Sequence, residues 1–259
     1  MRRSDGFVLD LDGTVYLGER LIPGADRAVA RLRAAGSRVV FVSNKPIESR
    51  AAYAAKLTRL GIPTPADDVI NSSLVLARYL ARETPGATLI AIAEPPLIAD
   101  LEQAGLVVTE CPERARWVVI SFDRTFDYKK LHLAFRAIRH GAEPIATNPD
   151  RTCPVDGGEV PDCAAMIGAI EGCTGRRVEV IVGKPSPITA DAALRMLDLP
   201  AGACLMVGDR PDTDVRMGND AGMDTALVLT GVTRADEVPT LADRPTHVLE
   251  SVAELEGFA

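Results

Sequence analysis

The stretch FVLDLDGT, residues 7–14, decides the fold class. Its apolar run ends in Asp10 and Asp12, and Gly13 and Thr14 then mark a turn. A short apolar run that ends in a turn is typical of a buried strand. Because side chains alternate along a strand, the two aspartates lie on the same side, where they repel each other unless a cation or proton separates them. This predicts a polar site, with a solvated turn as the alternative.

Similar apolar runs recur along the chain with helical segments between them. They span residues 38–44, 68–72, 203–209, 225–231 and 247–251, and helices are predicted at 24–35 and 187–197. This alternation predicts an α/β fold, a Rossmann-like parallel sheet with helices on both faces. The carboxyl ends of parallel strands form one edge where ligands bind, so we expect the polar residues at these ends to converge.

The middle of the chain predicts a second, smaller α/β module. Strands are expected at residues 88–94, 116–122 and 143–148, separated by helices at 95–105 and 127–140. The predicted domains are therefore a discontinuous core, residues 1–79 and 179–259, and an inserted module, residues 80–178.

The composition is that of an ordinary globular enzyme. Of 259 residues, 47% are hydrophobic and 25% charged, and the formal net charge of -7 argues against nucleic-acid and anionic-membrane partners. No apolar run approaches the ~18 residues of a membrane helix, and no signal-peptide core is present. The five cysteines show no C-x-x-C spacing, which indicates reduced thiols. A cytoplasmic location is expected.

Further polar residues stand at the predicted edge. Asp209 ends the run 203–209, and hard divalent cations bind such carboxylates. Magnesium fits better than zinc because no histidine or cysteine lies nearby in the motif. Asp212 and Asp214 follow in the next turn, where the helix dipole also favours acidic residues.

Three more residues could contact an anion at this edge. Lys184, one of only five lysines, precedes a predicted helix and would neutralise a phosphoryl group. Ser43 and Asn44 end the second strand, where they could donate hydrogen bonds to phosphate oxygens or simply cap the next helix.

Four motifs taken together resemble the haloacid-dehalogenase-like phosphohydrolase superfamily over essentially the whole chain. They are DLDGT (10–14), VSN (42–44), GKPSP (183–187) and GDRPDTD (208–214). The inserted module looks like a class IIA cap, and residues 145–154 and 161–171 resemble the sugar-phosphatase and nitrophenylphosphatase branch. Lys45 departs from the pattern, because many relatives have a second asparagine or an arginine there.

The resemblance implies a magnesium-dependent phosphatase acting on small phosphomonoesters, with sugar phosphates first. Asp10 would be the nucleophile that forms an aspartyl-phosphate, and Asp12 the general acid and base. Mg²⁺ would be held by Asp10, the backbone carbonyl of Asp12 and Asp209, with Asp214 acting through water. Lys184 would assist catalysis and, with Ser43 and Asn44, bind phosphate.

The resemblance also places substrate-specificity residues in the cap. The candidates are Asn148, Asp150, Arg151, Glu159, Asp162 and Cys163. The partner is expected to be a small phosphorylated metabolite, and a homodimer through the cap is left open. Two alternatives remain: a phosphomutase, and a non-catalytic sugar-phosphate-binding protein on the same fold.

Overall fold

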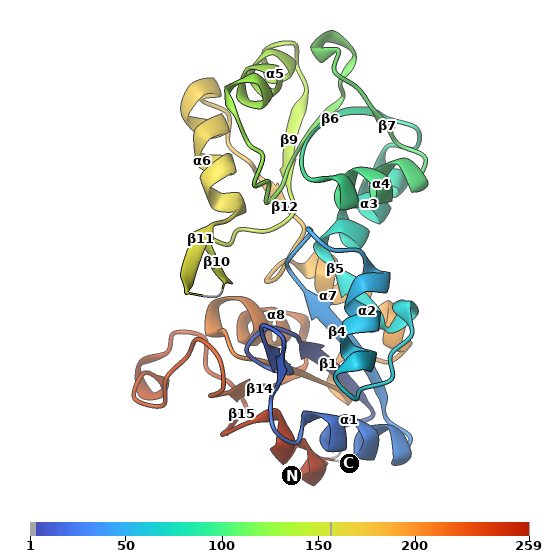
Figure 1. The fold of residues 1–259 in the computed structure, drawn as a ribbon, viewed down its shortest axis with the longest axis vertical. Helices are drawn as coiled ribbons and strands as arrows, with labels where there is room; N and C mark the ends of the chain where they lie inside the picture. Colours follow the sequence, from blue (N-terminus) through green and yellow to red (C-terminus); the bar gives the residue numbers. More distant parts are fainter. Residues whose placement is uncertain (1–3, 156, 259) are drawn as a thin grey trace. The chain divides into compact units, whose positions relative to one another are not determined.

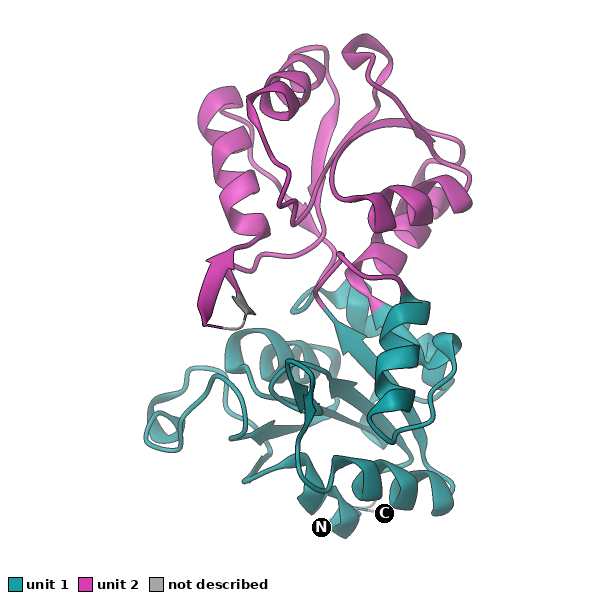
Figure 2. Ribbon diagram, viewed as in Figure 1, with its two compact units in different colours: residues 1–43, 50–70, 184–259 teal, residues 44–49, 71–183 magenta. Residues whose placement is uncertain are grey.

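The chain folds into two compact units (Figure 2). The computed structural model describes residues 4–155 and 157–258, with the backbone alone for residues 154 and 155. Unit 1 comprises the chain up to residue 43, residues 50–70 and the chain from residue 184. Unit 2 comprises residues 44–49 and 71–183. Compared with the predicted module 80–178, unit 2 begins earlier and also takes in a short segment before residue 50.

A six-stranded sheet with the order β15-β14-β13-β1-β4-β5 forms the centre of unit 1 (Figure 1). Its strands are β1 (Gly6–Asp10), β4 (Arg38–Ser43), β5 (Val69–Asn71), β13 (Cys204–Gly208), β14 (Asp224–Val228) and β15 (His247–Leu249). β1 pairs in parallel with both β13 and β4, and parallel pairing continues through β14 to β15. The predicted Rossmann-like core is confirmed, with β1 in its middle.

Helices pack on both faces of this sheet. They are α1 (Ala25–Ala34), α2 (Arg50–Arg59), α7 (Pro187–Leu197) and α8 (Arg216–Ala221), with the further helical turns η1 (Ala66–Asp68), η3 (Ala201–Ala203), η4 (Pro211–Val215), η5 (Val238–Thr240) and η6 (Val252–Phe258). Leu9 points to one face and joins a buried cluster with Leu32 of α1 and Leu57 of α2. Met206 points to the other face, against Gly218 of α8. Burial on both faces explains why the strands are apolar throughout.

A small hairpin follows β1 in unit 1. It consists of β2 (Tyr16–Leu17) and β3 (Arg20–Leu21), which pair antiparallel. The turn between Asp10 and Tyr16 joins this hairpin to the central strand, so the hairpin begins directly beside the carboxyl end of β1.

Unit 2 contains a second parallel sheet, with the strand order β12-β9-β8-β6-β7. Its strands are β6 (Thr88–Ile92), β7 (Val107–Val108), β8 (Trp117–Ile120), β9 (Glu143–Ala146) and β12 (Val180–Ile181). Its helices are α3 (Ser72–Glu83), α4 (Pro95–Gln103), α5 (Tyr128–Arg139) and α6 (Cys163–Thr174), with the turn η2 (Pro112–Arg114). A hairpin of β10 (Thr152–Val155) and β11 (Gly158–Pro161) was not predicted from the sequence.

All five cysteines are free thiols. Within residues 4–155 and 157–258, no helix has both the length and the apolar character that crossing a bilayer requires.

Candidate active site

The turn after β1 brings Asp10 to the edge of the sheet in unit 1. The Leu11 carbonyl accepts hydrogen bonds from the amides of Val15 and Tyr16, at 2.9 and 3.2 Å, which ends the strand. Gly13 has a φ of 90°, a conformation that residues with a side chain rarely adopt, and a Cβ there would lie 2.5 Å from the Asp209 carboxylate. The glycine of the first motif therefore allows the turn to approach Asp209.

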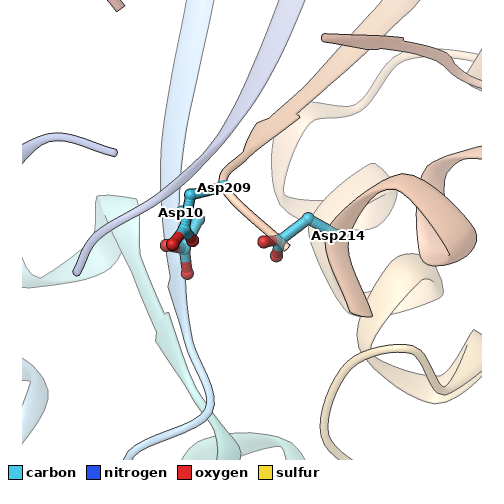
Figure 3. Close-up of side chains that lie close together, drawn as sticks. All are labelled: Asp10, Asp209 and Asp214. Atoms are coloured by element: carbon cyan, nitrogen blue, oxygen red, sulfur yellow. The ribbon is translucent and has the colours of Figure 1, made fainter. Parts of the chain in front are cut away.

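Three carboxylates from two neighbouring strand ends meet at this edge. Asp10 ends β1, Asp209 follows β13, and Asp214 lies in the π-helical turn η4. One carboxylate oxygen of each lies within 4.8 Å of the others, and all three side chains are buried. Figure 3 shows the Asp214 carboxylate pointing toward the other two. The structure thus brings together aspartates that are far apart in the sequence.

Lys184 supplies the positive charge in this cluster. Its Nζ donates hydrogen bonds to Oδ1 of Asp10 and, at 2.6 Å, to Oδ1 of Asp214. The side chain is 4% exposed, so these ion pairs lie away from solvent. Burial by itself lowers the pKa of Lys184, but the two carboxylates outweigh this effect and raise it. Lys184 is therefore a permanent cation at the site.

The pKa values of the three carboxyl groups are raised because the groups are buried close together. Burial raises the pKa of Asp10 to about 7, opposed by Lys184, and the charges of Asp214 and Asp12 add to the rise. Burial and the charge of Asp10 raise the pKa of Asp209 to about 6, and burial also raises the pKa of Asp214. Three buried acids share one ammonium group, which leaves the cluster short of positive charge.

A loop after β14 holds the cluster in place, and the sequence reasoning missed it. The Val232 amide donates to Oδ2 of Asp209 at 2.7 Å, and the Thr233 hydroxyl donates to the Asp209 carbonyl at 2.6 Å. The Thr230 hydroxyl donates to the Gly13 carbonyl at 2.6 Å. The run 225–231 ends at the same sheet edge, a signal that could have identified this loop.

Two residues of the second motif belong to different units. Ser43, buried, ends β4 one residue beyond Val42, the register partner of Asp10. Asn44 belongs to unit 2, where its amide donates to Oδ2 of Asp150 at 3.1 Å. Lys45 is in unit 2 as well, and its charge lowers the pKa of Asp162, which burial raises more strongly.

Three of the predicted specificity residues form a hydrogen-bonded network in unit 2. Asn148 is fully buried and donates to Asp150 at 2.9 Å and to Asp162 at 3.1 Å. Its own oxygen accepts from the Thr147 hydroxyl at 2.8 Å. Asp162 also caps the amino end of α6, accepting from the Cys163 amide. Asn148 therefore fixes two acidic side chains beside the start of a helix.

Of the other three predicted specificity residues, two have exposed side chains and one lies in the hydrophobic cluster of unit 2. Arg151 and Glu159 have exposed side chains, on the loop before β10 and on β11. Cys163 is fully buried in the hydrophobic cluster of unit 2, and its thiol donates to the Ile120 carbonyl at 3.6 Å. Burial raises the pKa of this thiol to about 12, so it stays protonated at neutral pH.

Truncation of Asn148 is expected to destabilise the protein. Asn148→Ala removes the donor to two neighbouring carboxylates, and we expect a loss of about 1–3 kcal/mol in the free energy of unfolding. Urea denaturation measures this loss. Arg151→Ala, at an exposed position, serves as the control and should change stability by less than about 0.5 kcal/mol. Equal stability of the two variants would contradict the network.

The fold and the site together define a Rossmann-like α/β enzyme with a buried acidic centre at the carboxyl edge of its sheet. Comparison with known proteins agrees with this class. The family model of haloacid dehalogenase-like hydrolases matches residues 7–107, and a HAD-hydrolase-like model matches residues 181–255.

Relatives match over almost the whole chain. The sugar-phosphatase AraL of Bacillus subtilis is 39% identical, over 98% of this chain and 93% of its own length. The 5'-nucleotidase YutF of Bacillus subtilis is 34% identical, over 98% of each chain. The structure of a p-nitrophenyl phosphatase from Archaeoglobus fulgidus superposes with a TM-score of 0.94 at 32% identity, covering 99% of this chain and 100% of that one.

This chain belongs to the haloacid dehalogenase-like hydrolases. Within that family it is a phosphoric monoester hydrolase, in agreement with the resemblance seen in its four motifs.

Proposed function

We propose that the protein is a magnesium-dependent phosphatase that hydrolyses small sugar phosphates through an aspartyl-phosphate on Asp10. The observation that carries this proposal is the contact of Lys184 with both Asp10 and Asp214, in a cluster completed by Asp209. A nucleophilic carboxylate beside a fixed cation suits phosphoryl transfer, which depends mainly on positioning and charge neutralisation.

Asp10 and Asp12 would carry the bond changes. An oxygen of Asp10 attacks phosphorus, the ester P–O bond breaks, and Asp12 gives its proton to the departing alcohol. A water molecule then attacks the phosphorus of the aspartyl-phosphate and gives a proton to Asp12. Inorganic phosphate leaves, and both aspartates return to their starting states. Lys184 would neutralise the phosphoryl oxygens, with Ser43 and Asn44 as hydrogen-bond donors.

The residues present fit a magnesium ion. The donors are oxygens, and Oδ1 of Asp209 is buried with no hydrogen-bond partner among the described residues. Asp10, Asp209 and the carbonyl of Asp12 would hold the ion, which supplies positive charge between nucleophile and phosphate. Both oxygens of Asp214 already accept hydrogen bonds, from Lys184 and from the Arg210 amide, which supports a role through water.

Magnesium is expected to stabilise the fold more at pH 7.5 than at pH 5. In the folded protein the pKa of Asp10 is raised from 3.8 to about 7 and that of Asp209 from 3.8 to about 6. Without a cation, the folded state therefore binds more protons than the unfolded state in this range, and its stability falls as the pH rises toward these values. Bound Mg²⁺ offsets this loss, and at about 100 times its Kd it contributes about 2.7 kcal/mol. At pH 5 protons compete with the ion.

Thermal unfolding in EDTA and in Mg²⁺ measures this effect without any substrate. Asp209→Asn should remove most of the magnesium-dependent rise in Tm, whereas Asp212→Asn, at an exposed position, should keep it. A magnesium effect of the same size at both pH values would contradict the expectation.

We assign recognition of the leaving group to unit 2. Asn148 and Asp162 are buried, whereas Asp150 is half-buried, so the Asp150 carboxylate is the group of this network that could accept a hydrogen bond from a sugar hydroxyl, with Asn148 holding it in place. Unit 2, residues 44–49 and 71–183, would be the cap that the sequence predicts over residues 80–178.

The test is a screen of phosphorylated metabolites for released phosphate. Pentose and hexose phosphates are expected to give the highest kcat/KM, above nucleoside monophosphates. Isomerised sugar phosphate without free phosphate would indicate a mutase. Tight binding by calorimetry without turnover would indicate a binding protein.

A further inference from the structure

The turn that carries Asp12 is bonded through its backbone to strand β2 of the β2–β3 hairpin. Asp12 forms a backbone bridge with Tyr16, and the Gly13 amide donates to the Tyr16 carbonyl at 2.8 Å. The backbone of Tyr16 is therefore the partner that sets the path of the chain through Asp12. Any movement of the hairpin at Tyr16 would move this turn.

Lys56 of α2 contacts the side chain of Tyr16. Tyr16 is 1% exposed, and Nζ of Lys56 lies 4.0 Å from the centroid of its ring. The lysine side chain is 13% exposed, so this cation–π contact is largely removed from water. Such contacts are stronger when desolvated.

The same ammonium group holds the hairpin turn. Nζ of Lys56 lies 3.1 Å from Oε1 of Glu19, and Arg59 pairs with the other oxygen of Glu19 at 2.7 Å. Both pairs share the Glu19 carboxylate, which is 71% exposed, so solvent weakens each of them, but Lys56 at 13% is far less exposed than Arg59 at 62%. Lys56 therefore contacts both the Tyr16 ring on β2 and the Glu19 carboxylate in the turn between β2 and β3.

The turn that carries Asp12 also contacts the loop after β14. The Thr230 hydroxyl donates to the Gly13 carbonyl at 2.6 Å. The Asp12 segment thus lies between a hydroxyl from the loop after β14 and a hairpin held by α2.

We infer that Lys56 is a positioning residue for proton transfer, holding the Tyr16–Glu19 hairpin so that Asp12 stays within reach of the leaving alcohol. The inference rests on the proposed function, in which Asp12 is the general acid. Lys56 itself contacts Tyr16 and Glu19 and acts through them. Loss of its ammonium group should loosen the turn without changing Asp10 or its partners.

The leaving group provides a selective test. An alkoxide needs a proton as it departs, whereas p-nitrophenolate is a stable anion that leaves without one. For Lys56→Met, which keeps the apolar stem, kcat/KM for ribose 5-phosphate should fall about tenfold, part of the full contribution of general acid catalysis. For p-nitrophenyl phosphate it should stay within about twofold. Lys56→Arg keeps the charge and should restore most of the loss.

Hydrogen exchange gives a second measurement that does not depend on turnover. Peptides covering residues 11–21 should exchange faster in Lys56→Met than in the wild type. The control is Lys129→Met, whose lysine is 79% exposed and 4.0 Å from Glu110, and it should change neither exchange nor kinetics.

Failure of the positioning role of Lys56 and failure of the proposed phosphatase function would give different results. Equal losses on the two esters, or unchanged exchange in residues 11–21, would overturn the positioning role of Lys56. A wild-type protein that releases phosphate from neither ester would instead overturn the proposed function.

Discussion

Asp10→Asn is expected to reduce kcat by at least about a thousandfold, the largest effect of any substitution considered. Asparagine keeps the shape of the side chain but is a poor nucleophile, so the aspartyl-phosphate would not form. The variant should stay folded, because Lys184 retains its ion pair with Asp214 at 2.6 Å. Phosphate release gives the rate. Acid quench followed by intact-mass measurement should detect one added phosphoryl group in the wild type alone.

The control for this variant is Asp212→Asn. Asp212 lies in the same motif as Asp209 and Asp214 but is exposed, and it should retain activity within about twofold. Turnover by Asp10→Asn at the wild-type rate would exclude Asp10 as the nucleophile. A phosphorylated Asp10→Asn protein would place the covalent step on another residue.

Gly231→Ala is expected to lower magnesium affinity on the order of 10- to 100-fold, the range seen for residues that orient metal ligands. A Cβ at Gly231 would lie 2.0 Å from Oδ2 of Asp209, so either the loop or the carboxylate must move. We expect either movement to disturb the 2.7 Å hydrogen bond from the Val232 amide to Asp209. Magnesium titration of activity and of Tm measures the change, and high magnesium should recover part of kcat.

Gly202→Ala is the matched control for this substitution. Gly202 lies in the same unit, and a Cβ there would meet no atom within 4 Å. Its magnesium titration should match that of the wild type. If Gly231→Ala also matched the wild type, the loop after β14 would have no part in holding Asp209.

The sequence predicted the core of the fold because its strands are short apolar runs separated by regular helices. β1, β4 and β13 are buried on both faces, which makes their sequences unmistakably apolar. The β10–β11 hairpin was missed, since Pro154, Gly157 and Gly158 interrupt the alternation by which a strand is recognised. The extent of unit 2 depends on contacts between distant segments, which local patterns do not reveal.

In the candidate site, residues that act through their side chains could be predicted, whereas those that act through the backbone could not. Asp10, Asp209 and Lys184 could be selected by residue type at a strand end. The loop around Val232 could not be selected in this way, because it acts through a main-chain amide that every residue but proline has. The contact between Lys56 and Tyr16 joins segments that are separate in the sequence, and neither residue stands in a motif.

The central place of β1 has a consequence for biosynthesis. Asp10 is made early, but its strand partner β13 and its counter-ion Lys184 come from the last third of the chain. A nascent chain that ends before residue 184 therefore has one unpaired side along β1 and a carboxylate without its ammonium group. Under the proposed mechanism, the growing chain is therefore not expected to hydrolyse phosphate esters before the segment from Lys184 to Asp209 has been made and folded.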